Sequence, residues 1–118
     1  MRRVLIFIVA YKAENTIENV LSRIPESFEK ELDIEILIID DSSDDDTFKI
    51  SSRIKGEPSY QYRIALLYNP ENLGYGGNQK SCYNKALDLG ADIVIMLHPD
   101  YQYTPKLIQA MASIIANN

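Results

Sequence analysis

The sequence predicts an α/β fold in which helices cover both faces of a mainly parallel sheet. Short apolar runs alternate with segments whose apolar residues recur at helical spacing, so a strand–helix unit occurs four times. The apolar runs are continuous, which is typical of strands that are buried on both faces. We therefore expect a three-layer sandwich around a four-stranded parallel sheet with right-handed crossover connections.

The first half of the chain predicts two strand–helix units. Residues 4–9 form an apolar run, and the helical pattern after it ends before Pro25, because proline disrupts a helix interior. Residues 34–39 predict the second strand, residues 40–46 a polar loop and residues 47–54 a weaker helix. The apolar residues that recur at helical spacing are Ile17, Val20, Leu21, Ile24 and Phe28, and Pro25 falls inside this pattern.

The third unit follows a turn at residues 56–59. Residues 63–68 predict a strand, and residues 69–77 predict a loop. Residues 79–89 predict a helix that Gly90 closes, since glycine commonly ends helices.

The fourth unit consists of a strand at residues 93–97 and a last helix. Thr104 suits the N-cap of that helix and Pro105 its first turn. Because 118 residues are enough for one domain and too few for two, we expect residues 1–118 to form a single domain. The apolar residues on one face of the last helix are Leu107, Ile108, Met111, Ile114 and Ile115.

Charge, cysteine content and the length of the apolar runs bear on the partners and the location of the protein. The formal net charge of -5 argues against nucleic acid, whose binding needs clustered lysine and arginine. Cys82 is the one cysteine and has no partner for an internal disulfide, which favours a reducing, cytoplasmic location. The apolar runs, such as residues 4–10, are far too short to span a bilayer.

In a parallel sheet of this kind, ligands bind outside the carboxyl ends of the strands. That rule selects four segments as candidate site elements, and three of them carry polar or glycine-rich motifs. These segments are residues 10–14, 40–46, 69–80 and 98–103.

The second segment holds five aspartates between residues 40 and 46. One interpretation is a solvated acidic turn whose last aspartate, Asp46, caps the next helix. The other depends on Asp40 and Asp41, which directly follow a buried strand, where a carboxylate needs a hydrogen-bond donor. A base N–H group or a ribose hydroxyl would satisfy that need.

The third and fourth segments allow similar pairs of interpretations. The glycine-rich stretch at residues 72–80 opens a helix, where backbone N–H groups favour a phosphate, but a tight turn explains it equally well. Asp100 and Gln102 offer oxygen ligands suited to Mg²⁺ or Mn²⁺. Alternatively, Asp100 caps the last helix and His98 is a polar residue that closes a strand.

Taken together, the four segments resemble glycosyltransferase family 2, and within it the polyprenol-phosphate sugar transferases. Residues 9–17 resemble the family's Tyr-Asn-Glu-type turn, and residues 39–47 its Asp-Asp-Gly-Ser-x-Asp-x-Thr loop. Residues 72–77 match its Asn-x-Gly and glycine-rich helix start, and residues 98–102 its Asp-x-Asp motif extended by x-Gln. His98 replaces the first aspartate of that motif, and Ser42 replaces the usual glycine of the acidic loop.

The resemblance implies the nucleotide-diphospho-sugar transferase (GT-A) fold and an inverting transfer of sugar from a nucleoside diphosphate sugar to an acceptor, such as a polyprenyl phosphate or a glycan. Under it, residues 1–118 are the nucleotide-sugar-binding N-terminal portion of a longer transferase. The implied cation is Mn²⁺ or Mg²⁺, held by Asp100, Gln102 and His98. The implied nucleotide-binding residues are Ala10, Tyr11, Glu14, Asp40, Asp41, Gly74 and Lys80.

The resemblance also implies that the catalytic base and the acceptor side lie beyond Asn118, so that this chain alone would not transfer sugar. Membrane contact would come only from that further part, which would place the full-length protein at the inner face of the membrane. Two alternatives remain from another class of protein. One is a degenerate transferase used for protein contacts, and the other is a receiver-like regulatory domain, although receivers carry their acidic pair after the first strand.

Overall fold

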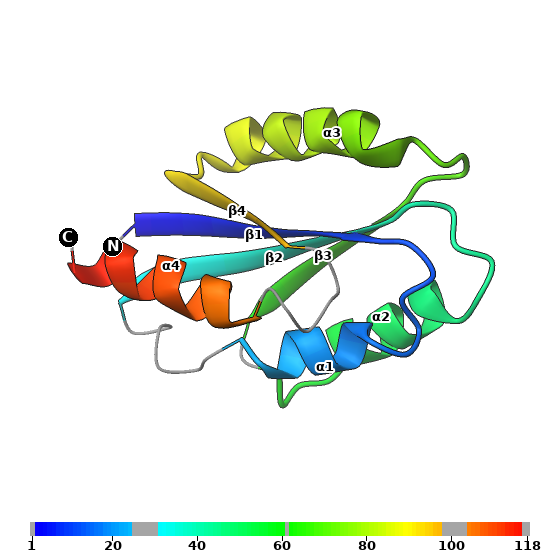
Figure 1. Ribbon diagram of the computed structural model, residues 1–118, viewed down its shortest axis with the longest axis horizontal. Coiled ribbons are helices and arrows are strands. Elements are labelled where there is room, and N and C mark those ends of the chain that lie inside the picture. The colour runs from blue at the N-terminus through cyan, green and yellow to red at the C-terminus, as the bar shows by residue number, and fades with distance from the viewer. Residues whose placement is uncertain (1, 25–30, 61, 98–103, 117–118) are drawn as a thin grey trace.

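The computed structural model describes residues 2–24, 31–60, 62–97 and 104–116 of the chain. Strands and helices alternate strictly, as the sequence predicts (Figure 1). The elements are β1 (Arg2–Ala10), α1 (Ile17–Ser22), β2 (Leu32–Asp40), α2 (Thr47–Lys55), β3 (Arg63–Tyr68), α3 (Gly74–Leu89), β4 (Ile93–Leu97) and α4 (Thr104–Ala116).

The four strands form one parallel sheet in the order β3-β2-β1-β4. The central strand β1 pairs with β2 from Arg2↔Leu32 to Ala10↔Asp40, and with β4 from Val4↔Ile93 to Ile8↔Leu97. All four strands therefore end at the same edge of the sheet, which we call the carboxyl edge. The expectation of a parallel α/β sandwich is confirmed.

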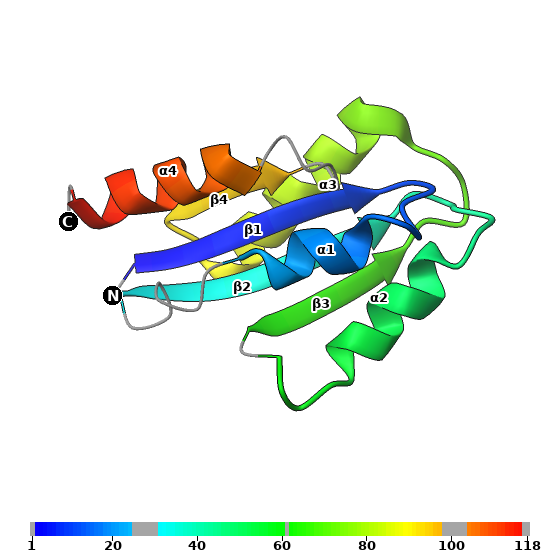
Figure 2. The same ribbon diagram turned by 60° about the horizontal axis from the view of Figure 1, so that its bottom comes forward.

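Helices cover both faces of the sheet. Helix α3 lies alone on one face, whereas α1, α2 and α4 lie on the other (Figures 1 and 2). Alternate residues of the central strands face the two layers, because successive side chains of a strand point to opposite faces. Ile6 and Ile8 thus belong to the core under α1, α2 and α4, while Leu5 and Phe7 pack under α3 with Cys82.

One boundary differs clearly from the sequence prediction. Helix α3 begins at Gly74 instead of residue 79, so the glycine-rich segment forms its first turns and not a loop. The helix starts early because a carboxylate in the β2–α2 loop accepts its first N–H groups. Gly74 also has a φ of +69°, a conformation that glycine adopts at little cost.

Within the described part of the chain, no helix is long and apolar enough to cross a membrane.

Candidate functional site at the carboxyl edge of the sheet

Three loops meet where β1, β2 and β3 end. The register pairs Ala10 with Asp40 and Asp40 with Tyr68, so these strands end level with one another. Just beyond the strands, the Asp41 N–H donates to the Ala10 carbonyl at 2.8 Å, and the Asn69 N–H donates to the Asp40 carbonyl at 2.9 Å. The β2–α2 loop therefore lies between the β1–α1 loop and the β3–α3 loop.

Two hydroxyl groups bind the β1–α1 loop to the β2–α2 loop. The Lys12 N–H donates to Ser43 Oγ at 2.9 Å, and the Ala13 N–H donates to Thr47 Oγ1 at 2.8 Å. A third bond runs the other way, from the Asp46 N–H to Glu14 Oε2 at 3.0 Å. Glu14, one of the residues expected near the nucleotide, thus joins the two loops through its carboxylate.

Asp41 binds the β2–α2 loop to the start of α3. Its carboxylate accepts the Leu73 N–H at 2.8 Å and the Gly74 N–H at 3.0 Å. It also accepts the Asn69 side-chain amide at 3.0 Å. Leu73, the N-cap residue of α3, makes no side-chain cap bond, so Asp41 supplies the cap from the β2–α2 loop.

The bonds to Asp41 also set its charge. Burial alone would raise the pKa of the Asp41 carboxyl, but the bonds that it accepts, first of all from the Leu73 amide, lower it below its ordinary value of 3.8. The positive end of the α3 dipole favours the same charged form. Asp41 is therefore an ionised anion that already occupies the helix start where the sequence suggested a phosphate.

A buried amide network, which the sequence analysis missed, extends from Asp41 into α3. Asn69 Nδ2 donates to Asn78 Oδ1 at 2.7 Å, and Asn78 Nδ2 donates to the Gly74 carbonyl at 2.7 Å. Asn78 is fully buried. The available signal was its position four residues before Cys82, on the face of α3 that packs on the sheet.

Asp40 differs from its neighbour. Its side chain is fully buried, and its Oδ1 accepts the Ser43 N–H at 2.9 Å. Its Oδ2 has no hydrogen-bond partner among the residues that the structure describes. Because an unpaired buried carboxylate oxygen is costly, such an atom at a ligand-binding edge marks a place for a donor group.

The rest of the acidic loop caps the start of α2, but through Asp45 and not through Asp46 as the sequence suggested. Asp46 makes no side-chain cap bond to α2. Asp45 Oδ1 instead accepts both the N–H group and the hydroxyl of Thr47, and these bonds lower the Asp45 pKa against the opposing effect of burial. The side chains of Asp44 and Asp46 are exposed.

Two residues of the adjoining loops adopt left-handed backbone conformations that non-glycine residues rarely take. Lys12 has a φ of 52° and Ser42 a φ of 66°. Strain of this kind persists only where surrounding contacts fix it, and it concentrates at functional sites. Tyr11, next to Lys12, is 48% exposed, and the Lys12 ammonium lies 5.4 Å from the centre of its ring.

The remaining expected residues stand apart from this cluster or outside the described part. Lys80 is an exposed residue of α3 two positions after Asn78, which directs it about 200° away around the helix. His98, Asp100 and Gln102 lie outside the described residues. Strand β4 ends just before them, with Leu97 beside Ile8 of β1. In the described segments no group of three acidic, histidine or cysteine side chains is arranged to hold a metal.

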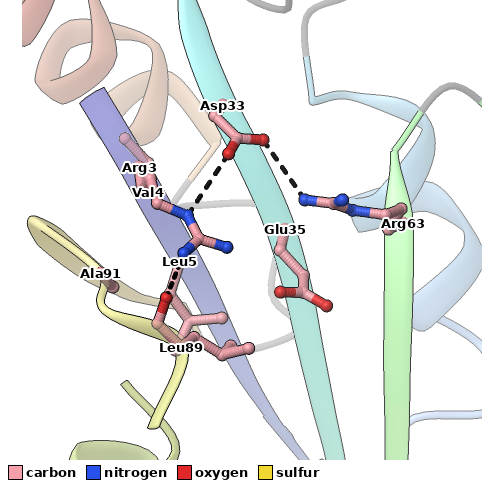
Figure 3. Close-up of a pocket in the computed structure, with 8 residues that line it drawn as sticks. All are labelled: Arg3, Val4, Leu5, Asp33, Glu35, Arg63, Leu89 and Ala91. Atoms are coloured by element: carbon pink, nitrogen blue, oxygen red, sulfur yellow. Dashed lines mark hydrogen bonds and ion pairs between the residues drawn. The ribbon is translucent and has the colours of Figure 1, made fainter. Parts of the chain in front are cut away.

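Two pockets lined by described residues lie away from this edge. One small pocket is at the opposite, amino edge of the sheet (Figure 3). There Asp33 pairs with Arg3 at 3.4 Å and with Arg63 at 3.3 Å, and Arg3 also donates to the carbonyl of Leu89 at the end of α3 (Figure 3). Asp33 thus pairs with both arginines, and the bond from Arg3 to Leu89 attaches the end of α3 to the sheet. We therefore assign the pocket a structural role. A second pocket lies between α1 and α2.

Comparison with known proteins agrees with this fold. The family model for glycosyl transferase family 2 matches residues 5–118, so the chain belongs to that family. The receiver-like alternative is therefore not supported.

The chain is also similar to a particular enzyme of this kind. It is 27% identical over 125 residues to the UDP-N-acetylglucosamine–dolichyl-phosphate N-acetylglucosaminyltransferase of Methanococcus voltae. The comparison covers 98% of this chain and 48% of that relative, so the chain spans about half the relative's length.

Proposed function

We propose that the protein is an inverting glycosyltransferase and that residues 1–118 contain its donor-binding half. The observation that carries this proposal is the buried Asp40 Oδ2, which has no hydrogen-bond partner among the described residues and lies where three loops meet at the carboxyl edge. Ligands of open parallel sheets bind at that edge. In this proposal the acceptor side and the catalytic base belong to a further part of the protein.

The proposed donor is a nucleoside diphosphate sugar, and its base and ribose lie against the β1–α1 and β2–α2 loops. Tyr11 is exposed at this edge and offers a ring on which a base stacks. Asp40 offers Oδ2, an oxygen that no described residue engages. Asp41 Oδ2 accepts the Gly74 N–H and keeps capacity for a second donor, so either carboxylate suits a base N–H or a ribose hydroxyl.

The M. voltae relative suggests the finer identity of the substrates. Its name specifies a uridine nucleotide sugar and a dolichyl phosphate acceptor. We extend both to this protein, as a uridine diphosphate sugar and a polyprenyl phosphate. A membrane-embedded acceptor would bring the full-length protein to the cytoplasmic membrane surface.

The proposal includes a divalent cation, Mn²⁺ or Mg²⁺, which would offset the charge of the departing diphosphate. Asp100 would supply a carboxylate, Gln102 a carbonyl oxygen and His98 an imidazole. The imidazole is a softer ligand than oxygen and would shift the preference of the site from Mg²⁺ toward Mn²⁺. Lys80 stays a candidate for contact with the diphosphate.

The test is a titration of the full-length protein with UDP and with GDP, with and without Mn²⁺. We expect UDP to bind more tightly than GDP, and Asp40→Asn to weaken UDP binding by at least about tenfold, since an amide loses a charged acceptor. Asp41→Asn shows whether the second carboxylate also contacts the nucleotide. Asp44→Asn is the matched control, because this exposed aspartate of the same loop should leave affinity unchanged.

Absence of binding to both nucleotides, in folded protein with Mn²⁺ present, would contradict the proposal. Equal affinities in wild type, Asp40→Asn and Asp44→Asn would remove the assigned role of Asp40.

A further inference from the structure

The β1–α1 loop carries the exposed Tyr11 and is attached to the rest of the site through few groups. The N–H groups of Lys12 and Ala13, directly after Tyr11, donate to two hydroxyl oxygens, Ser43 Oγ in the β2–α2 loop and Thr47 Oγ1 at the first residue of α2. Both acceptors are buried, Ser43 to 7% exposure and Thr47 to 0%. These two hydroxyls therefore face the neighbouring loop and not solvent.

The Thr47 hydroxyl is fixed in orientation by its second partner. It donates to Asp45 Oδ1, so its lone pairs are directed toward the Ala13 N–H. A hydroxyl that donates to a carboxylate is a stronger acceptor, because neighbouring hydrogen bonds polarise one another. Asp45, Thr47 and Ala13 thus form a chain of bonds from one loop to the next.

The backbone at Lys12 shows that the loop conformation depends on these bonds. A lysine with a φ of 52° is strained, and the surrounding contacts must hold it. Two contacts that hold the backbone there are the bond from its own N–H group to Ser43 Oγ and the bond from the next N–H group to Thr47 Oγ1. Tyr11 immediately precedes the strained residue, so these bonds hold the segment of backbone that carries its ring.

We propose that Ser43 and Thr47 are positioning residues, which act on the nucleotide through Tyr11 and without touching it. This inference rests on the proposed function, since it assigns the two hydroxyls the task of holding Tyr11 in the orientation that stacks on the base. The acidic loop then contributes twice to donor binding, directly through its first aspartates and indirectly through its hydroxyls. Glu14 strengthens the same bridge by accepting the Asp46 N–H at 3.0 Å.

The test measures UDP affinity in the full-length protein for Thr47→Val, Thr47→Ser and Tyr11→Ala. Valine keeps the shape of threonine but removes the acceptor of the Ala13 N–H, and we expect about tenfold weaker UDP binding. Serine keeps the hydroxyl and should bind UDP within about twofold of wild type. Ser52→Ala is the control, because it removes an exposed hydroxyl from the same helix α2.

A double-mutant cycle separates positioning from general damage to the fold. Once Tyr11 is alanine, Thr47→Val should cause no further loss of UDP affinity, because the ring that it positions is gone. Affinity is expressed per folded protein. If Thr47→Val lowers the folded fraction, Ser43→Ala tests the other hydroxyl that binds the β1–α1 loop.

The outcomes are distinct. No UDP binding by the wild type overturns the proposed function and this inference with it. UDP binding by the wild type with undiminished affinity in both Thr47→Val and Ser43→Ala overturns the inference alone. Additive losses from Tyr11→Ala and Thr47→Val also overturn it.

Discussion

Two adjacent aspartates have different tasks because consecutive residues at the end of a strand point to opposite faces of the sheet. Asp40 continues the row of Ile36 and Ile38, under α1, α2 and α4. Asp41 points to the other face, where its carboxylate accepts the first N–H groups of α3. One residue keeps an unpartnered oxygen among the described groups, and the other is engaged by three donors.

The depressed pKa of Asp41 predicts an acid-dependent loss of stability. Since the folded-state pKa lies below the ordinary value of 3.8, the charged carboxylate stabilises the fold above that value. This contribution is lost as pH falls through the folded pKa, where both states bind the proton. We expect Asp41→Asn to lower the free energy of unfolding by about 1–3 kcal/mol at pH 7. The difference from wild type should shrink below about pH 4.

Urea unfolding at a series of pH values from 7 to 2 measures this difference. A gap between wild type and Asp41→Asn that stays constant down to pH 2 would show that the charge of Asp41 is not the stabilising feature. The exposed Asp44 serves as the control, and Asp44→Asn should follow the wild-type curve.

Helix α3 shows how one element depends on a distant residue for its start. Its first turns contain glycines, which are poor helix formers, and its N-cap residue has no capping side chain. The helix is nevertheless formed from Gly74 because Asp41 accepts the N–H groups of Leu73 and Gly74 at its start. Gly77 packs closely against Leu73 in the first turn, because a Cβ atom at Gly77 would lie 2.8 Å from Leu73 Cβ.

Two glycines of α3 should respond oppositely to alanine. Gly77→Ala forces the Leu73 backbone to shift and should destabilise the protein by about 1–3 kcal/mol. At Gly76 a Cβ atom meets nothing within 4 Å, so Gly76→Ala should stabilise it by about 0.5–1 kcal/mol through helix propensity. Urea unfolding of the two variants provides the comparison. Equal changes of the same sign in the free energy of unfolding would show that the contact with Leu73 does not restrict the side chain at position 77.

At the scale of the whole molecule, the two faces of the sheet are covered unequally. Three helices lie on one face and α3 alone on the other (Figures 1 and 2). Cys82 is fully buried in the layer between α3 and the sheet, in contact with the core that includes Phe7 and Leu37. Burial raises the pKa of its thiol to about 11. The thiolate is the reactive form, so a thiol that is buried under α3 and has a raised pKa reacts slowly. The reactivity of Cys82 therefore measures how often α3 leaves the sheet.

We expect the Cys82 thiol to react with a disulfide reagent at pH 8 at least about a thousandfold more slowly in the native protein than in urea. Both burial and the raised pKa slow the reaction, and it proceeds only when α3 opens. Absorbance of the released thiol gives the rate, and the urea-unfolded protein is the reference. A native rate close to the unfolded rate would mean that α3 does not protect this face.

Much of the fold follows from the sequence by itself. Continuous apolar runs and helical spacing determined the type, order and approximate bounds of the strands and helices. They do so because the faces that an element buries determine which of its residues are apolar. The parallel arrangement and the carboxyl-edge position of the aspartates followed from the alternating order. The resemblance to glycosyltransferase family 2 came from four motifs in sequence order and agrees with the family match.

Only the tertiary structure decided how the loops at that edge are joined. The sequence left Asp40 and Asp41 as equivalent candidates and placed the start of α3 too late, since the cap of that helix comes from a residue 32 positions before Leu73. The bonds from Lys12 and Ala13 to Ser43 and Thr47 cross from one strand end to the next. Such bonds exist only once the strand order places those ends side by side, and no local pattern in the sequence records which strands are neighbours.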